Sequence, residues 1–118
     1  MQDRDHCAGE IIKGVSRKGQ AVVLVLAGEI DMDCSVTLRN RIRDLLRDNP
    51  PVLVVDMTEV EFMDSSGLGT LVEALRWSRR NGGQLKLVGL AESVRSVFEI
   101  SRLETVFEIY DTEAEALS

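Results

Sequence analysis

The chain has 118 residues, and 14 Lys and Arg against 20 Asp and Glu give it a formal charge of −6. That length suits one domain with one core, and 44% hydrophobic with 29% charged residues is typical of a globular protein rather than a disordered one. The acidic balance argues against a nucleic-acid partner, no apolar run reaches the roughly 18 residues of a membrane span, and the first residues are unlike a signal peptide.

The first half of the chain predicts two strands and a helix. A polar tail, residues 1–9, precedes a weak strand at residues 10–15, a hairpin turn at residues 17–20 and a nearly all-apolar strand at residues 21–27. A helix follows, because apolar residues recur at helical spacing. They are Cys34, Leu38, Ile42 and Leu45. Asp31 or Asp33 can cap this helix, and two prolines at 50–51 end it.

The second half alternates strands and helices. Strands are expected at residues 52–55, which end at Asp56, at residues 84–88 and at residues 105–110. Three helices are expected around and after them. The first is marked by Leu68, Leu71, Val72 and Leu75, and the second by Val94, Val97, Phe98 and Ser101. The third is a short helical stretch over residues 111–117.

The resulting order of elements is β-β-α-β-α-β-α-β-α. Strands that alternate with helices pair in parallel through right-handed crossovers, and the opening hairpin adds one antiparallel strand. The sequence therefore predicts a single α/β domain over residues 10–118, with a mixed five-stranded sheet and about four helices.

Ser65 occupies the boundary between a strand and a helix, after Asp64 and before Ser66 and Gly67. The backbone N–H groups at a helix start lack partners within the helix, so a phosphate attached there would meet hydrogen-bond donors. The alternative is purely structural: Asp64 or Ser65 is an N-cap, and Gly67 allows close packing. The residues alone leave both interpretations open.

Enzymatic alternatives are weak. The sole histidine, His6, lies in the polar tail, so Ser65 has no base nearby, and the Gly-x-Ser-x-Gly motif is absent. A dinucleotide loop lacks its third glycine, and a receiver-type phosphoaspartate switch lacks its last lysine, since none follows Lys86. Asp31 and Asp33 are better explained as caps than as ligands of a cation. We expect no cofactor and no metal site.

Trp77 and the arginines are the other conspicuous residues. On a helical projection Trp77 lies nearly opposite the apolar stripe, on the side of Thr70 and Glu73. It is therefore a candidate anchor for a partner, or it lies along a neighbouring helix and covers arginine stems. The arginine runs at 39–43 and 79–80 are interpreted as solvated helix faces. Cys7 and Cys34 have no metal or redox spacing, so we expect two free thiols in a reducing cytoplasm.

The stretch Phe62-Met63-Asp64-Ser65-Ser66-Gly67-Leu68-Gly69 resembles the hallmark of the STAS-domain anti-sigma factor antagonists. Leu26-Ala27-Gly28-Glu29-Ile30-Asp31 resembles a second motif of that family, and Asn81-Gly82-Gly83-Gln84-Leu85 resembles its helix-to-strand connection. The motifs occur in the family's order, and the resemblance covers roughly residues 10–116.

The resemblance implies a binding protein rather than an enzyme. In the family, the unmodified antagonist binds an anti-sigma factor that is also a serine kinase, which releases a sigma factor. Phosphorylation ends binding, and a PP2C-type phosphatase restores it. The matching acceptor is Ser65, and the expected partner-binding residues are Asp31, Asp64, Ser66 and Gly67, with Trp77 added from its position. The alternative is a STAS scaffold or ligand-sensing module in another signalling assembly.

Overall fold

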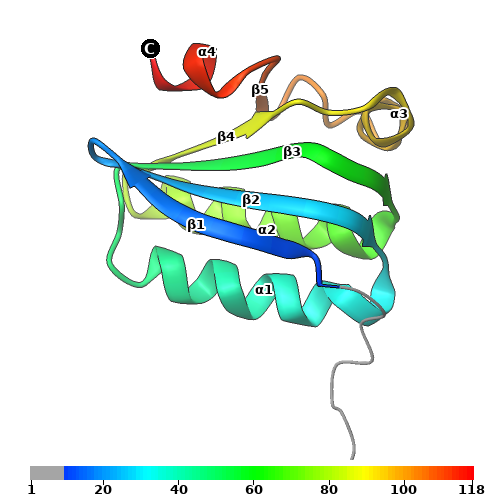
Figure 1. Ribbon diagram of the computed structural model, residues 1–118, viewed down its shortest axis with the longest axis horizontal. Helices are drawn as coiled ribbons and strands as arrows, with labels where there is room; N and C mark the ends of the chain where they lie inside the picture. The colour runs from blue at the N-terminus through cyan, green and yellow to red at the C-terminus, as the bar shows by residue number, and fades with distance from the viewer. Residues whose placement is uncertain (1–9) are drawn as a thin grey trace, which may run out of the picture.

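The computed structural model describes residues 10–118, so the polar tail at 1–9 and Cys7 lie outside the described residues. The elements follow the predicted order (Figure 1). They are β1 (Ile12–Lys18), β2 (Ala21–Ile30), α1 (Met32–Leu46), β3 (Val52–Met63), α2 (Ser65–Arg80), β4 (Gln84–Val88), α3 (Glu92–Ile100), β5 (Glu108–Tyr110) and α4 (Glu113–Leu117). The predicted α/β class is confirmed.

The five strands form one sheet in the order β1-β2-β3-β4-β5. β1 pairs with β2 in an antiparallel hairpin, and the remaining neighbours are parallel. The parallel pairing of β2 with β3 places Ile30 opposite Met63, so the two strands end together. The helices that follow, α1 and α2, therefore begin at the same end of the sheet (Figure 1).

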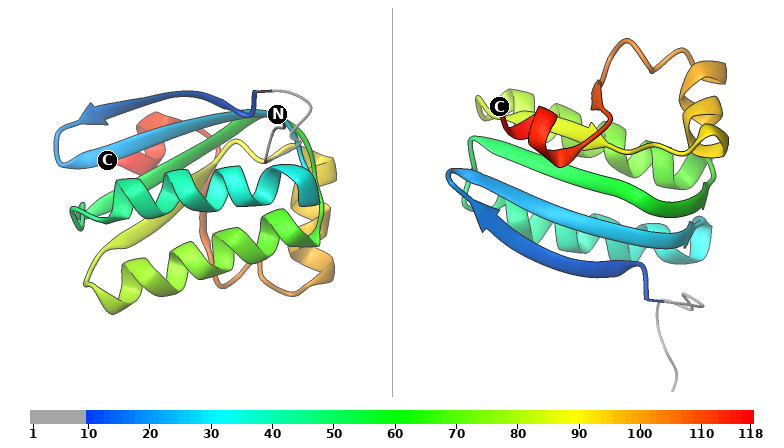
Figure 2. Two further views of the ribbon diagram at one scale, coloured as in Figure 1. Left: turned by 90° about the horizontal axis from the view of Figure 1, so that it is seen from below. Right: turned by 45° about the horizontal axis from the view of Figure 1, so that its top comes forward.

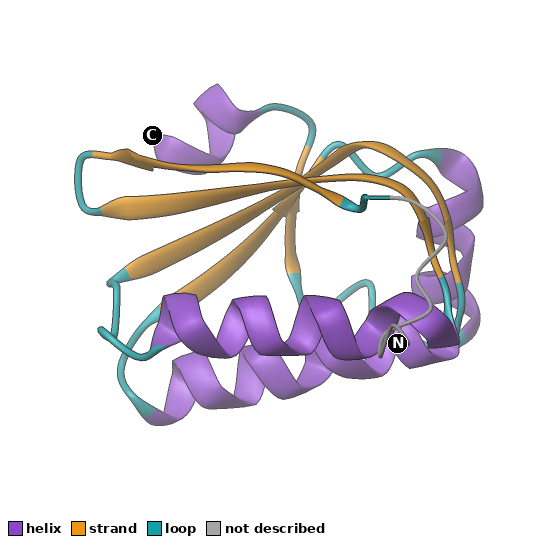
Figure 3. Ribbon diagram, turned by 60° about the horizontal axis from the view of Figure 1, so that its bottom comes forward, coloured by secondary structure: helices purple, strands orange, loops and turns teal. Residues whose placement is uncertain are grey.

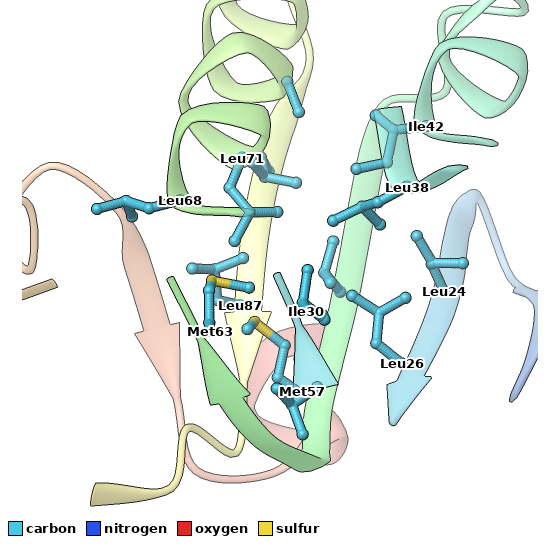
Figure 4. Close-up of a cluster of buried hydrophobic side chains, with 14 of the residues drawn as sticks. Leu24, Leu26, Ile30, Leu38, Ile42, Met57, Met63, Leu68, Leu71 and Leu87 are labelled. Atoms are coloured by element: carbon cyan, nitrogen blue, oxygen red, sulfur yellow. The ribbon is translucent and has the colours of Figure 1, made fainter. Parts of the chain in front are cut away.

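Helices α1 and α2 lie side by side along one face of the sheet (Figure 3). Helix α4 lies on the other face, and α3 lies near the strand ends where α1 and α2 begin (Figures 1 and 2). The main core lies between the sheet and the α1–α2 pair, where aliphatic side chains from both layers meet (Figure 4). Full burial of one leucine side chain there stabilises the folded state by about 1.5–3 kcal/mol relative to leaving it exposed. The fully buried aliphatic side chains include Leu24, Leu26, Ile30, Leu38, Leu53, Leu71 and Leu87.

Strand β3 is longer than predicted. The sequence indicated an end at Asp56, but the strand continues to Met63. The carboxylate of Asp56 accepts hydrogen bonds from the backbone N–H and hydroxyl of Thr58, a local pattern typical of turns. The register with β2 shifts at this point, between Val25 and Ala27, so the chain forms a bulge and resumes pairing. The turn-like residues mark an irregularity inside the strand.

The expectation of a free thiol at Cys34 is wrong. Cys34 is buried in the first turn of α1, and its sulfur is part of a disulfide. The helical spacing that placed Cys34 on the core face of α1 was correct, because Leu38 and Ile42 are buried on that face with it. Helical spacing predicts the face of α1 on which Cys34 lies, but it carries no information about whether the sulfur is oxidised.

Candidate functional site

Asp64, rather than Ser65, caps helix α2. One carboxylate oxygen of Asp64 accepts hydrogen bonds from the backbone N–H groups of Ser66, at 2.9 Å, and Gly67, at 3.2 Å. The hydroxyl of Ser66 donates to the same oxygen at 2.6 Å. Two of the N–H groups that a helix start leaves unpaired are thus already satisfied. The N–H groups of Ser66 and Gly67, which an added phosphate was expected to meet, are thus engaged by Asp64.

The carboxyl group of Asp64 is held in its charged form. Burial raises its pKa, but hydrogen bonds from the Ser66 hydroxyl and from the backbone N–H groups of Gly67, Ser66 and Met32 outweigh burial and lower the pKa below its ordinary value. A fixed negative charge therefore lies next to Ser65 at neutral pH.

Ser65 is the first residue of α2, and it is exposed. Because Asp64 supplies the cap, the Ser65 side chain is not needed to hold the helix start. Its hydroxyl makes no hydrogen bond to any residue within the described range 10–118. A solvent-facing hydroxyl on a rigid first turn is accessible to the active site of another protein. The capping role considered for this pair of residues thus belongs to Asp64, and Ser65 remains without a role in the fold.

The loop before α1 joins this site. Asp31 caps α1 by accepting hydrogen bonds from the N–H groups of Asp33, at 3.0 Å, and Cys34, at 3.2 Å. The N–H of Asp64 donates to the carbonyl of Ile30 at 3.2 Å. Ile30 directly precedes Asp31, so this hydrogen bond links the residues that cap the two helices. The parallel strands thus bring Asp31 and Asp64 to one end of the molecule, although 33 positions separate them in the chain.

Gly67 is buried, and its role is close packing. A Cβ atom at this position would lie 2.9 Å from Cγ of Met63 and 3.0 Å from Cγ2 of Ile30. The first turn of α2 therefore approaches the ends of β2 and β3 more closely than any side chain allows. Gly67 sets where Ser65 is held relative to the sheet.

Two exposed apolar side chains flank the site, and the sequence interpretation missed both. Met32, whose N–H contacts Asp64, is 70% exposed, and Phe62 is 46% exposed. Neither stood out in the sequence, because Met32 is the first residue of a helix and Phe62 is the second-last residue of a strand. The helix start thus presents a serine between carboxylates and apolar groups, a composition suited to a protein interface.

Trp77 lies elsewhere, in a groove between α1 and α2 that also contains Thr70 and Glu73. The three residues do share one side of α2, as predicted, but that side faces α1, so Thr70 is buried and Trp77 is 37% exposed. The alternative in which Trp77 lies along a neighbouring helix is therefore the better description. Trp77 is not part of the Ser65 site.

Within residues 10–118, no cluster of three or more His, Cys, Asp or Glu side chains is arranged to hold a metal ion. None of the described helices combines the length and the apolar character needed to cross a bilayer.

The STAS domain family matches residues 13–116. The anti-sigma-B factor antagonist of Listeria monocytogenes is 35% identical over 92 residues, which cover 78% of this chain and 81% of that protein. The crystal structure of an anti-sigma factor antagonist from Mycobacterium paratuberculosis has a TM-score of 0.82 and 28% identity, and covers 99% of this chain and 96% of that one. The phosphorylated form of SpoIIAA, a Bacillus cell fate determinant, has a TM-score of 0.70 and 25% identity, with 88% and 95% covered.

The chain belongs to the STAS-domain family of anti-sigma factor antagonists. The fold and the family expected from the sequence are both confirmed. These relatives are named for a regulatory role, the antagonism of anti-sigma factors.

Proposed function

We propose that this protein is an anti-sigma factor antagonist that binds an anti-sigma factor serine kinase through the Ser65 end of α2, releases a sigma factor, and is switched off by phosphorylation of Ser65. The observation that carries the proposal is the exposed Ser65 hydroxyl, which has no hydrogen bond to a described residue and stands beside a helix cap that Asp64 supplies alone. The existence of SpoIIAA in a phosphorylated form supports a modified state in this family.

The proposed interface combines charge and apolar contact. Asp31, Asp64 and Ser66 present polar groups at the two helix starts, and Met32 and Phe62 add apolar area. Gly67 acts indirectly, because it allows the first turn of α2 to pack against the sheet. Trp77 lies in the α1–α2 groove, so we assign it no contact with the kinase.

The switch follows from the cap. A phosphate on Ser65 adds roughly 1.5 to 2 negative charges. The two N–H groups next to it are engaged by Asp64, whose carboxylate is charged, so the phosphate stays exposed at the surface that meets the partner. A few kcal/mol of repulsion and desolvation at the interface correspond to a loss of a hundredfold or more in affinity. The fold itself changes little, because the cap stays in place.

The protein itself carries no catalytic step in this scheme. The kinase supplies the phosphoryl transfer from ATP, and a PP2C-type phosphatase removes the phosphate. The protein works in the cytoplasm, where its partners and the sigma factor meet. The alternative, a STAS scaffold or ligand-sensing module, lacks the Ser65 cycle and is distinguished by a phosphorylation experiment.

The test is incubation of the full chain with ATP and the anti-sigma factor kinases encoded in the same genome, followed by mass spectrometry. We expect one added phosphate at Ser65, absent in Ser65→Ala, and we expect Ser65→Asp to bind the kinase at least a hundredfold more weakly than the unmodified protein. Ser16→Asp is the matched control. Ser16 is exposed on β1, so this substitution adds the same charge at a site away from Ser65. Equal binding by Ser65→Asp and the unmodified protein would refute the proposal, as would phosphate at another residue.

A further inference from the structure

The starts of α1 and α2 form an acidic end of the molecule, made of Asp31, Met32, Asp33 and Asp64. Met32 is 70% exposed and stands directly between Asp31 and Asp33, and its N–H contacts the carboxylate of Asp64. The Asp33 carboxylate is exposed, and it makes no hydrogen bond or ion pair with any residue in the range 10–118. The acidic end thus presents a projecting apolar side chain flanked by three carboxyl groups.

The groove between α1 and α2 has the complementary composition. It has a volume of about 310 Å³, and its floor is apolar, because Ile42, Leu46 and Ala74 are nearly buried there. Four arginines and one glutamate line the groove, a net charge of +3 on a chain that carries −6 overall. The walls are formed by Arg39 and Arg43 of α1 and by Glu73, Arg76, Trp77 and Arg80 of α2.

Most of the guanidinium groups in the groove have no counter-charge. Among the residues that the structure describes, Arg43, Arg76 and Arg80 form no ion pair. The helix dipole favours arginines near the ends of helices, but it does not make them converge on one groove. A carboxylate fits between the walls, because Nε of Arg39 lies 3.3 Å from a carboxylate oxygen of Glu73. Three guanidinium groups therefore remain for carboxylates of another molecule.

The two surfaces match in arrangement as well as in charge. At the acidic end an apolar side chain lies between carboxylates, and in the groove an apolar floor lies between arginines. Methionine is flexible enough to fill an irregular pocket, and its sulfur makes favourable contacts with aromatic rings such as Trp77. The two surfaces of one molecule cannot meet, since the ten positions from Met32 to Ile42 correspond to about 15 Å along α1. A contact between them needs two copies.

We propose that the acidic end of one copy docks into the α1–α2 groove of a second copy. Met32 inserts over the apolar floor beside Trp77, and the carboxylates of Asp31 and Asp33 pair with arginines of the walls. The two surfaces differ, so each copy in a pair keeps one free acidic end or one free groove, and association continues head to tail. The docked copy covers the start of α2, so self-association and the kinase binding proposed above exclude each other.

The test is sedimentation of the full-length protein in the analytical ultracentrifuge, without any kinase. We expect the weight-average mass to rise above that of the monomer over roughly 10 µM to 1 mM, because one side chain and a few exposed ion pairs make a weak contact. Raising the ionic strength from about 0.05 M to about 0.5 M should weaken association at least about tenfold, since salt screens exposed charges. Salt would instead strengthen unspecific association of molecules that each carry −6, so stronger association in salt would contradict the proposal.

Two complementary variants locate the contact. Met32→Ala with Asp33→Asn alters the acidic end, Arg76→Gln with Arg80→Gln alters the groove, and each variant alone should remain a monomer over the same concentrations. An equimolar mixture should form a heterodimer that grows no further, because the first variant keeps an intact groove and the second keeps an intact acidic end. The recovery of binding on mixing also shows that both variants are folded.

The control is Arg17→Gln with Arg41→Gln, which makes the same change of charge as the groove variant. Both arginines are exposed and lie outside the groove, so this variant should associate as the unmodified protein does.

Three further outcomes would overturn the proposal. They are a monomer at concentrations up to about 1 mM and low ionic strength, association that persists in both altered variants, and the lack of a heterodimer in their mixture. Because the sedimentation experiment contains no kinase, these outcomes would leave the function proposed for Ser65 untouched, and a failed phosphorylation test would leave self-association untouched.

Discussion

The two ends of the α1–α2 pair differ in chemistry although they belong to the same helices. The N-terminal end carries Asp31, Asp33 and Asp64 with two exposed apolar side chains, and the groove toward the C-terminal end carries arginines and an indole. Because both helices follow parallel strands, their dipoles point the same way and favour this distribution of charge. The sheet topology therefore gives the two ends of the helix pair opposite charge.

The largest expected effect is a loss of kinase binding when the N-terminal end of the helix pair is altered. Replacing both Met32 and Phe62 with alanine removes the exposed apolar area beside Ser65, and we expect affinity for the anti-sigma factor kinase to fall about a hundredfold, or about 3 kcal/mol. Titration calorimetry measures the loss. Ile100→Ala removes an apolar side chain that is 83% exposed on α3 and should leave affinity within about twofold. An unaffected double variant would place the kinase elsewhere on the protein.

The next effect concerns the packing that holds the Ser65 end in place. Gly67→Ala puts a methyl group within 3.0 Å of Met63 and Ile30, so we expect a loss of about 2 kcal/mol in the free energy of unfolding, measured in urea. Gly69→Ala is the matched control in the same helix. Its added Cβ atom meets nothing within 4 Å, so that change should be neutral or stabilise the protein by up to about 1 kcal/mol. Equal effects of the two changes would contradict the packing role of Gly67.

The sequence predicted the order of elements because helical spacing and apolar strands are local signals. It left the choice between Asp64 and Ser65 as cap open, since both residue types cap helices well and only the three-dimensional structure shows which oxygen faces the N–H groups. It missed Phe62, because burial at a strand end depends on whether a later element covers it. It also ended β3 at Asp56, because a bulge and a turn share residue preferences.

The groove between α1 and α2, which is lined by arginines of both helices, shows a different limit. The spacing of residues within α2 correctly placed Trp77 with Thr70 and Glu73, but Arg39 and Arg43 on the opposite wall come from α1. The helical projection of α2 alone does not show which other helix packs against it. The site at Ser65 could be found through a motif, whereas the groove depends on contacts between two elements.

A smaller effect tests the charge held at Asp64. Asp64→Ala removes the cap and should cost about 1 kcal/mol at pH 7. The pKa of Asp64 is lowered in the folded state, so its contribution is complete above the unfolded value, roughly 3.9, and disappears as pH falls through the folded pKa. Unfolding in urea from pH 7 down to about 2 should therefore show the two proteins converging at acid pH.

The control for that series is Asp48→Ala. The Asp48 carboxylate is exposed and accepts no hydrogen bond from the residues that the structure describes, so its removal should leave stability nearly unchanged at every pH. A constant difference between Asp64→Ala and the unmodified protein down to acid pH would mean that Asp64 acts through its shape and not through its charge.

The smallest effect lies in the groove, at Glu73. Its ion pair with Arg39 is solvent-accessible, with 39% of the Arg39 side chain and 54% of the Glu73 side chain exposed, so Glu73→Gln should change the free energy of unfolding by less than about 1 kcal/mol. Urea unfolding of Glu73→Gln beside the unmodified protein measures the difference. A loss of more than about 1 kcal/mol would show that the Arg39–Glu73 pair contributes more to stability than exposed ion pairs do, and kinase binding at the Ser65 end should stay the same in either case.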